Sequence, residues 1–525
     1  MSLVRRNHKG IRPVFVTIML GLLLVLVAAC STSQGTAQGS TQPDTNGVAQ
    51  VNQAGAAVDV NKQDASATLH WDYKTHALTV KVDVDGLPPN SVHPNHIHLG
   101  VCSSNGPVKY PLKNIVANGE GDATATTVIQ GVAGGIPASG WYLNIHHGPG
   151  LATADQMAAI YCGNIANPSV KSDHDQDVKI TLHQFVLNGF TTVSKIDSTV
   201  PANGDVNPYG VAVVQKSVGN LVKGHILVSN FNNGANLQGT GTTIVQISPN
   251  GSKTTFAQLT SAACPDGIGL TTALVELKRG WVIVGSLPAA DGKFANVKAG
   301  CLIVLNSKGQ VVKTFSGSPI NGPWDASVVE NGDGDQATLF VTNILNGVVP
   351  ANNNVVNQGT VVRITLHVPE QNGGTPSIKE STVIATGFAE KTDPAALVIG
   401  PTGVALGKQN ILYVADTINN RIIAIPDALN RTTVSHADKH VLTANGSLNA
   451  ELGLTVAWNG NILTVNGGDG NIIEITPEGK QIVTKPISTM GTPPGAGCLF
   501  GLAVAPSGYA VYFVDDCTNQ LNSFH

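Results

Sequence analysis

One strand pattern recurs six times in the C-terminal part of the chain, and it constrains the fold more than any other feature. Each occurrence is a short apolar run that ends in a small or polar residue. The six runs are 226–230, 281–286, 339–343, 412–416, 462–466 and 512–515. The intervals between their last residues are 56, 57, 73, 50 and 49 residues. A repeat of this length indicates that one structural unit is used six times.

Other strands flank these runs and complete the repeating unit. A strand such as 209–213 precedes the run, a strand such as 243–247 follows it, and a turn such as 248–251 then opens a fourth strand. Only 12% of the residues are charged and 58 are glycines, which favours short strands and tight turns and argues against helical bundles and disorder. A lone four-stranded unit leaves both faces exposed, so neighbouring units must cover one another. The pattern predicts a six-bladed β-propeller over residues 178–525.

The last unit lacks a fourth strand of its own. The sequence reaches His525 directly after the third strand, 520–524. We expect the segment 178–195, which precedes the first unit, to supply the missing outer strand. Such a join ties the two ends of the ring together and makes its unfolding cooperative.

The N-terminal residues 1–29 have the layout of an export signal. Basic residues near the start are followed by an uncharged, mostly apolar run over 13–29, which is slightly short for a membrane span. The run ends Leu26-Val27-Ala28-Ala29-Cys30, which resembles the bacterial lipobox. The resemblance implies that Cys30 is lipidated and anchors the protein to the outer face of the bacterial membrane or envelope. The Ser-, Thr-, Gln- and Gly-rich stretch 30–57 reads as a flexible tether.

The cysteines beyond this signal are even in number, which in an exported chain predicts disulfide bonds. They are Cys102, Cys162, Cys264, Cys301, Cys498 and Cys517. The sequence leaves the connectivity open, and joining neighbours within the presumed domains gives Cys102–Cys162, Cys264–Cys301 and Cys498–Cys517. No CxxC spacing occurs, so a thiolate metal site is not expected.

Short alternating strands fill residues 58–167, and two of these strands carry histidines. His96 and His98 are two residues apart, so they point to the same face of one strand. The later strand carries His146 on one face and His147 on the other. Imidazoles placed in this way can converge on one metal ion. The residues predict a small antiparallel β-sandwich with a candidate metal site, followed by a polar linker over 168–177.

The HxH strand followed by Cys102, the late histidine strand and the segment 160–165 resemble the Cu/Zn superoxide dismutase sandwich. The stretch is similar to CHRD domains as well, which share an HIH strand and a late YxNxH strand. The superoxide dismutase resemblance implies that His96, His98 and His146 are copper ligands and that Cys102 is bridged to Cys162. His93 or His147 would complete the ligand set, and three neutral imidazoles with an open position suit Cu(II) or Zn(II).

This stretch departs from the superoxide dismutase pattern at two places. No histidine lies between Cys102 and Asn144, so the bridging histidine and the zinc-loop histidines of that family have no counterpart. No matching arginine lies between Gly148 and Cys162. A separate zinc site and fast superoxide dismutation are therefore not expected. An alternative interpretation is that the histidines are polar residues packed at the sandwich edge.

The segment 400–422 closely resembles the NHL repeat. The polar residues that end the recurring strands are candidates for one rim of the propeller: Asn230, Asn343, Asp416, Asn466 and Asp515. Asp325 is a further rim candidate. Six-bladed lactonases and gluconolactonases share this architecture and hold a catalytic Ca²⁺ with such oxygens. In an NHL unit, however, the aspartate bonds within its own blade, here to Arg421, so calcium is not expected.

The sequence leaves three classes of function open, and it does not decide whether the chain is an enzyme. The first is a cell-surface lipoprotein whose propeller binds or scaffolds a protein or small-molecule ligand, with a copper-binding sandwich. The second is a copper-dependent redox protein of the superoxide dismutase-like type, and the third is a calcium-dependent propeller lactonase or hydrolase. A net charge of −4 and the export signal argue against a nucleic-acid partner. Neither a Gly-x-Ser-x-Gly elbow nor a Walker loop is present.

Overall fold

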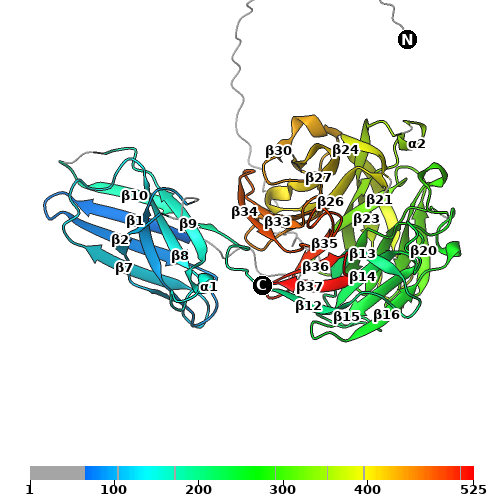
Figure 1. The fold of residues 1–525 in the computed structure, drawn as a ribbon, viewed down its shortest axis with the longest axis horizontal. Helices are drawn as coiled ribbons and strands as arrows, with labels where there is room; N and C mark the ends of the chain where they lie inside the picture. Colours follow the sequence, from blue (N-terminus) through cyan, green and yellow to red (C-terminus); the bar gives the residue numbers. More distant parts are fainter. Residues whose placement is uncertain are drawn as a thin grey trace, which may run out of the picture. The chain divides into compact units, whose positions relative to one another are not determined.

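The structure is a computed structural model, and its described part is almost entirely β. It describes residues 65–102, 106–170, 173–289, 291–351, 353–393, 396–508 and 510–525. The predicted export signal, Cys30 and the tether lie outside the described residues. In the part of the chain that is described, no helix is both long enough and apolar enough to cross a membrane. Figure 1 shows the course of the strands.

Two antiparallel sheets form the predicted β-sandwich. The first sheet has the order β10-β1-β2-β7 and contains β1 (Ala65–Asp72), β2 (Ala77–Val84), β7 (Ala123–Ile129) and β10 (Gln176–Thr181). The second has the order β11-β9-β8-β4-β5 and contains β4 (Asn95–Leu99), β5 (Val108–Pro111), β8 (Trp141–His146), β9 (Ala159–Ile165) and β11 (His183–Gln184). The pair β3 (Val92–His93) and β6 (Ile115–Val116) and the short helix α1 (Ala154–Met157) complete the domain.

The sandwich core follows from the period-two pattern of its strands. In β1 buried and less buried residues alternate, which places Leu69 and Trp71 on the inner face. The same alternation in β2 buries Leu78, Val80 and Val82. These side chains pack in one apolar cluster with Ile97, Leu143 and Ile145 of the second sheet. Each sheet therefore keeps one apolar face covered by the other.

The sandwich continues beyond its predicted end at residue 167. β10 pairs with β1, and β11 pairs with β9. The prediction of a linker over 168–177 is therefore wrong at its end, where β10 begins. The prediction that the propeller starts at 178 is wrong for 178–184, which belong to the sandwich. The alternating apolar residues of this stretch are buried in the sandwich core: Val178, Ile180 and Leu182. A period-two strand fits the edge of any sheet, so the sequence pattern could not indicate which sheet would take it.

Six sheets of four or more strands follow in the described residues, as the repeat predicts, and their pairing is antiparallel except for the short parallel contact of β29 with β24. Blade one contains β13 (Val206–Val213), β14 (Ile226–Asn232), β15 (Thr243–Ile247) and β16 (Lys253–Gln258), and blade two contains β17 (Leu274–Leu277), β18 (Trp281–Ser286), β19 (Cys301–Leu305) and β20 (Val311–Ser316). Blade three contains β21 (Pro323–Glu330), β22 (Gln336–Asn343), β23 (Val356–His367) and β24 (Ser377–Asp393), joined by β25 (Leu397–Ile399) and β29 (Ser435–His436), with α2 (Val348–Ala351) between β22 and β23.

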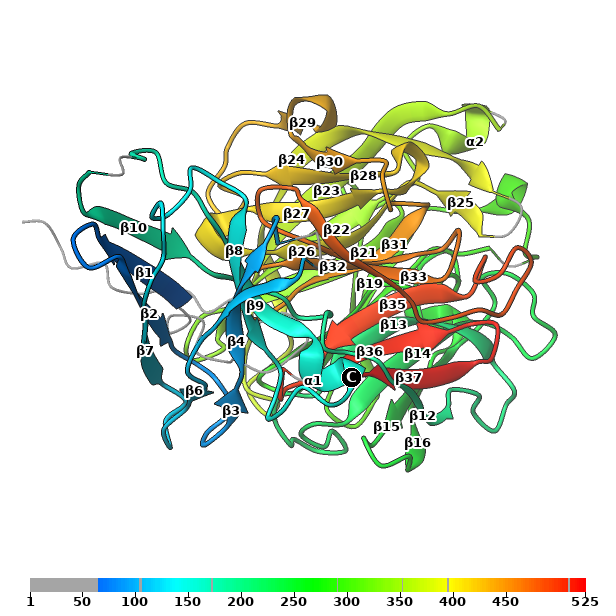
Figure 2. The ribbon, with the colours of Figure 1, turned by 60° about the vertical axis from the view of Figure 1, so that its left-hand side comes forward.

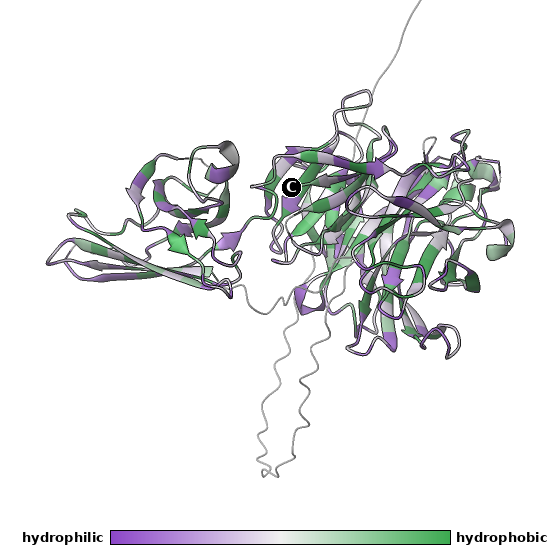
Figure 3. Cartoon of the chain, turned by 90° about the horizontal axis from the view of Figure 1, so that it is seen from below, coloured by the Kyte–Doolittle hydropathy of each residue, from purple (hydrophilic) through white to green (hydrophobic). Residues whose placement is uncertain are grey.

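The remaining blades follow the same order. Blade four contains β26 (Pro401–Leu406), β27 (Leu412–Asp416), β28 (Arg421–Ile425) and β30 (Val441–Ala444), and blade five contains β31 (Glu451–Val456), β32 (Ile462–Asn466), β33 (Asn471–Ile475) and β34 (Gln481–Pro486). Blade six contains β35 (Leu499–Val504), β36 (Val511–Asp515), β37 (Gln520–Phe524) and β12 (Val193–Ser198). Figure 3 shows the apolar residues concentrated in the blade strands and the polar residues in the connecting loops. The recurring runs of the sequence are the second strands of the six blades.

Blade six is closed by a strand from before the first blade. β12 pairs antiparallel with β37, with Val193 opposite Phe524. The prediction that the segment 178–195 closes the ring is therefore correct only for its last residues, and the closing strand continues to Ser198. The ends of the propeller meet within one sheet, which joins residues that are far apart in the sequence.

The long interval between the third and fourth repeats has a structural cause. β23 has 12 residues and β24 has 17, so this hairpin is longer than those of the other blades. β24 then pairs with β25 before the chain enters blade four. The 73-residue interval is thus one ordinary blade with an extended hairpin.

Buried carboxylates connect neighbouring blades. The two carboxylate oxygens of Glu330 in blade three both accept the backbone N–H of Lys278 in blade two, at 3.1 Å. Glu276 of blade two accepts the N–H of Gln215 from blade one. Burial raises the pKa of Glu330 to about 7, against the opposing effects of the Lys278 N–H and of the Lys278 and Arg279 charges.

We expect this glutamate to make the propeller less stable as the pH rises. The folded state keeps a proton on Glu330 that the unfolded chain has released, so the free energy of unfolding falls between the ordinary pKa of 4.5 and about 7. Each pKa unit corresponds to about 1.4 kcal/mol, so the rise from 4.5 to about 7 corresponds to a loss of about 3 kcal/mol. Urea unfolding at pH 5 and pH 8 should show this loss diminished in Glu330→Gln. It should be unchanged in Glu478→Gln, whose side chain is exposed; equal pH dependence in both variants would contradict the expectation.

Candidate metal centre

Three imidazoles from two neighbouring strands converge on one face of the second sandwich sheet. β4 carries His96 and His98, and β8 ends at His146. Figure 2 shows these two strands side by side, and they pair antiparallel. The imidazole ring centroids lie 5.1 Å apart for His96 and His146 and 5.8 Å apart for His98 and His146. Each ring offers a nitrogen within 4.8 Å of the others, so the structure brings together the three predicted copper ligands.

Backbone carbonyls fix the tautomers of two of these rings. His98 Nδ1 lies 2.8 Å from the carbonyl oxygen of Gly106, and His146 Nδ1 lies 2.6 Å from that of Met157. A carbonyl only accepts, so both Nδ1 atoms carry the hydrogen and both Nε2 atoms present a lone pair. His98 Nε2 is buried and has no hydrogen-bond partner. A buried, unpaired acceptor costs free energy unless something binds it, and a metal ion would do so.

His96 supplies the third nitrogen. Its Nδ1 lies 3.1 Å from His146 Nε2. Two imidazole nitrogens bound tetrahedrally at about 2.0–2.1 Å from one ion are about 3.3 Å apart, so this spacing fits two ligands of the same ion. The donor set that the geometry supports is therefore Nδ1 of His96 with Nε2 of His98 and His146.

The environment favours the neutral, metal-binding form of His96 and His146. Burial lowers the pKa of His96 to about 4, and the neighbouring His146 and His98 lower it further in the same direction. Burial lowers the pKa of His146, although the Met157 carbonyl opposes the shift. A ligand that is already deprotonated at neutral pH binds metal without competition from protons.

Two neighbours of the site were not among the predicted site residues. Tyr142 stacks on His98 with ring centroids 5.0 Å apart, and its hydroxyl oxygen accepts the N–H of Gly106. Asn144 lies opposite His96 in the strand pairing, and its Oδ1 is buried without a hydrogen-bond partner. The period-two rule could have identified both, since Tyr142 and Asn144 precede His146 at alternate positions on β8.

The two predicted additional ligands lie outside this group. His93 has both ring nitrogens in contact with protein: Nδ1 lies 3.0 Å from the carbonyl oxygen of His146, and Nε2 lies 2.7 Å from Ser91 Oγ. His147 is exposed at the end of β8. The described group of candidate ligands contains neither residue. His93 instead positions the backbone of His146.

All three predicted disulfide pairings are confirmed. Cys102–Cys162 joins the segment after β4 to β9, and the N–H of Cys102 donates to Asn164 Oδ1 at 2.8 Å. This bond holds the start of the loop whose Gly106 carbonyl fixes the His98 ring. The disulfide therefore supports the candidate ligand His98 as well as the fold.

We expect the double replacement Cys102→Ser with Cys162→Ser to destabilise the sandwich by about 2–5 kcal/mol. We also expect the copper affinity to fall roughly tenfold or more, because the loop that orients His98 loses its anchor. Urea unfolding and competitive copper titration of the full chain measure the two effects. The matched control is Cys264→Ser with Cys301→Ser, which should destabilise the propeller and leave copper affinity unchanged. An equal fall in copper affinity in both double variants would contradict the expectation.

The predicted rim residues make hydrogen bonds to nearby side chains and backbone groups. Asp416 Oδ2 accepts Arg421 Nε–H at 2.6 Å, as the NHL resemblance implies. The others make backbone hydrogen bonds: Asn343 Oδ1 accepts the N–H groups of Asn321 and Gly322, Asn466 Oδ1 accepts that of Asn449, Asp515 Oδ1 accepts that of Thr518, and Asn230 Nδ2 donates to Thr199. Among the described residues, Asp416 belongs to no group of three candidate His, Cys, Asp or Glu ligands, and Asp515 groups only with the disulfide-bonded Cys498 and Cys517. Asp325 lies on the innermost strand β21, whose pairing partner β22 ends at Asn343.

Comparisons with known proteins assign part of the chain. The family model of the CHRD domain matches residues 44–149, which include the three histidines. No curated protein matches the chain.

The solved structures that are similar to the chain match about two thirds of it. A gluconolactonase from Xanthomonas campestris is 11% identical, covers 64% of this chain and 90% of its own, and has a TM-score of 0.40. The calcium-binding protein regucalcin from Agrobacterium tumefaciens is 11% identical, with 64% and 93% coverage and a TM-score of 0.38. A virginiamycin B lyase from Staphylococcus aureus is 14% identical, with 63% and 98% coverage and a TM-score of 0.36. The propeller assignment itself rests on the six sheets described above.

Proposed function

We propose that the sandwich is a copper-binding domain that holds one ion through His96 Nδ1, His98 Nε2 and His146 Nε2. The observation that carries the proposal is the pair of carbonyl-fixed tautomers, which direct two lone pairs toward the nitrogen of His96. Cu(II) binds neutral imidazole more tightly than the other common divalent metals do. A copper ion bound there supplies one-electron redox chemistry. The protein's part is to keep the rings neutral, oriented and partly shielded from water.

We further propose that the protein is an exported lipoprotein whose propeller acts as a binding or scaffold module. The three disulfides fit an oxidising compartment outside the cytoplasm. The lipobox resemblance supports an anchor at Cys30, ahead of the polar tether. In this arrangement the propeller presents a ligand or partner site at the cell surface, and the sandwich holds the metal.

Metal analysis of the full chain tests the copper site. Protein purified in detergent, stripped with chelator and reloaded with Cu(II) should retain one copper per chain after dialysis. The electron paramagnetic resonance spectrum should show hyperfine coupling to imidazole nitrogens. Stoichiometric zinc that copper does not displace, or retention of copper without nitrogen coupling, would overturn the proposal.

The lipid anchor has its own test. We expect Cys30→Ser to move the protein from the membrane fraction to the soluble fraction, since acyl chains supply the membrane affinity. Fractionation of cells expressing each form, followed by immunoblotting, measures the distribution. Ser31→Ala is the matched control and should stay with the membrane. A Cys30→Ser chain that stays with the membrane would show that another feature anchors it.

A further inference from the structure

The innermost strands of five blades share an irregularity in their pairing, and blade three carries an aspartate where the other four carry a glycine. In five blades the inner strand loses register with the second strand at the same point, and two residues stay unpaired there. The second unpaired residue is glycine in four of these blades: Gly210, Gly403, Gly453 and Gly501. In blade three it is Asp325.

The glycines at this position are required by close contact with the next blade. A Cβ on Gly453 would lie 2.2 Å from the carbonyl oxygen of Phe500, and one on Gly501 would lie 1.9 Å from that of Tyr209. Both distances are too short for a side chain. A carboxylate at a position that otherwise excludes side chains is a local departure of the kind that marks a functional site.

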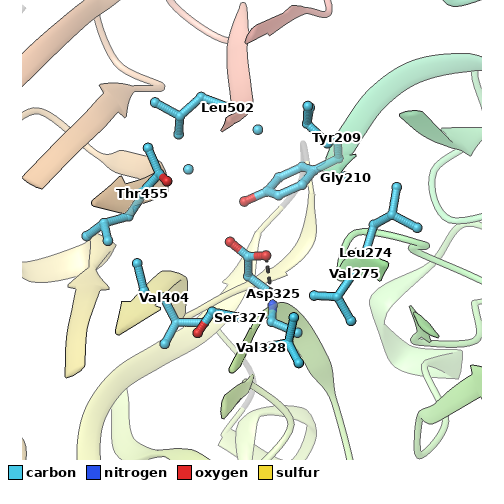
Figure 4. Close-up of a pocket in the computed structure, with 16 residues that line it drawn as sticks. Tyr209, Gly210, Leu274, Val275, Asp325, Ser327, Val328, Val404, Thr455 and Leu502 are labelled. Atoms are coloured by element: carbon cyan, nitrogen blue, oxygen red, sulfur yellow. Dashed lines mark hydrogen bonds between the residues drawn. The ribbon is translucent and has the colours of Figure 1, made fainter. Parts of the chain in front are cut away.

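Asp325 lines a cavity on the axis of the ring. The cavity has a volume of about 40 Å³, and the inner strands of all six blades contribute to its wall. Figure 4 shows apolar side chains such as Leu274, Val404 and Leu502 around it, with the carboxylate of Asp325 facing the hydroxyl of Tyr209. No lysine, arginine or histidine is among the lining residues. The space suffices for a small ion with one or two waters.

The cavity is lined by side-chain oxygens of Asp325, Tyr209 and Ser327, and no positively charged side chain among its lining residues balances the Asp325 carboxylate. One carboxylate oxygen of Asp325 accepts the N–H of Ala326 at 2.8 Å. Burial raises the pKa of Asp325 to about 8, so its ionised form needs a nearby positive charge to be stable at neutral pH. The hydroxyl oxygen of Tyr209 accepts the indole N–H of Trp324 at 2.7 Å. Ser327 is 8% exposed, and its Oγ is buried without a hydrogen-bond partner. An occupant that offers positive charge and takes oxygen ligands would satisfy these groups together.

We infer that the propeller channel binds one small monovalent cation, an alkali metal ion or ammonium, between the carboxylate of Asp325 and the hydroxyl oxygens of Tyr209 and Ser327. The charge selects the class: one carboxylate balances one positive charge. Ca²⁺ takes six to eight oxygen ligands, usually with several carboxylates, and Asp325 is the sole acidic residue among those that line the cavity. The site is independent of the copper proposal because it lies in the propeller.

Thermal unfolding of the full chain in different chloride salts at equal ionic strength tests the inference. The melting temperature of the propeller transition should be about 3 °C higher in NaCl, KCl or NH₄Cl than in choline chloride, whose cation is too large for the cavity. A rise in NH₄Cl alone identifies an ammonium site, and a rise in NaCl or KCl alone identifies an alkali metal site; each supports the inference.

Asp325→Gly is the informative variant because it gives blade three the glycine that four other blades carry at this position. It should fold and lose the dependence on the cation. Ser327→Ala keeps the carboxylate and should diminish the dependence, which provides a second test if Asp325→Gly does not fold. The inference would be overturned by equal melting temperatures of the wild-type chain in all four salts. It would also be overturned by an undiminished salt effect in Asp325→Gly, or by stabilisation from CaCl₂ alone.

Discussion

Replacing His98 by alanine is expected to lower the copper affinity of the full chain by more than about a hundredfold. Removing a residue that merely orients a ligand costs metal sites about 10- to 100-fold, and His98 is itself a proposed ligand. The copper-free sandwich should lose about 1 kcal/mol or less. The substitution removes the hydrogen bond between His98 Nδ1 and the Gly106 carbonyl and the stacking on Tyr142, and the removal of a buried nitrogen that lacks a hydrogen bond offsets part of this loss.

The matched control for this variant is His93→Ala, for which we expect the opposite pair of results. Both nitrogens of His93 bond to protein, so its loss should destabilise the copper-free sandwich by about 1–3 kcal/mol. Copper should still bind at one ion per chain. Competitive copper titration and urea unfolding in chelator separate the two variants. Copper binding that is lost in His93→Ala and kept in His98→Ala would show that the ligand set is assigned wrongly.

Truncating the chain after Asn519 should prevent the propeller from forming a stable ring. The deletion removes β37, which lies between β36 and the closing strand β12. Leu521 and Phe524 of this strand are buried in the apolar clusters of the last blades. The loss of a central strand should cost more than about 5 kcal/mol, which is comparable with the whole stability of many domains.

Removing His525 alone is the matched control for the truncation. β37 then stays complete, since it ends at Phe524. We expect this chain to melt within about 2 °C of the wild type, while the chain truncated after Asn519 shows no cooperative propeller transition and is cleaved rapidly by protease. A truncated chain that melts cooperatively near the wild-type temperature would show that the ring does not depend on its closing sheet.

The disulfides and the three histidines were predicted at the level of residues. Pairing neighbouring cysteines within presumed domains gave the observed bonds, because each pair lies within one sandwich or one propeller region. The i, i+2 spacing of His96 and His98 fixes their common face in any strand. It does not reveal the ring tautomers, since the carbonyls of Gly106 and Met157 that fix them belong to other segments.

The position of Asp325 shows a second limit of prediction from the sequence. Asp325 was a rim candidate in the sequence because it follows a Gly-Pro-Trp segment. Its equivalence to Gly403 and Gly453 becomes visible only when the bulges of the blades are aligned by their strand pairing. The surrounding wall comes from six strands spread along the chain, and no local pattern records that arrangement.

The sequence by itself determined the repeating β architecture, the number of blades and the alternating faces of the strands. These depend on periodicity and turn residues, which act over a few neighbouring positions. Only the tertiary structure decided that 178–184 complete the sandwich and that β12 closes the ring. An alternating strand pairs equally well with any open edge, so its partner is chosen by the long-range packing of the whole chain.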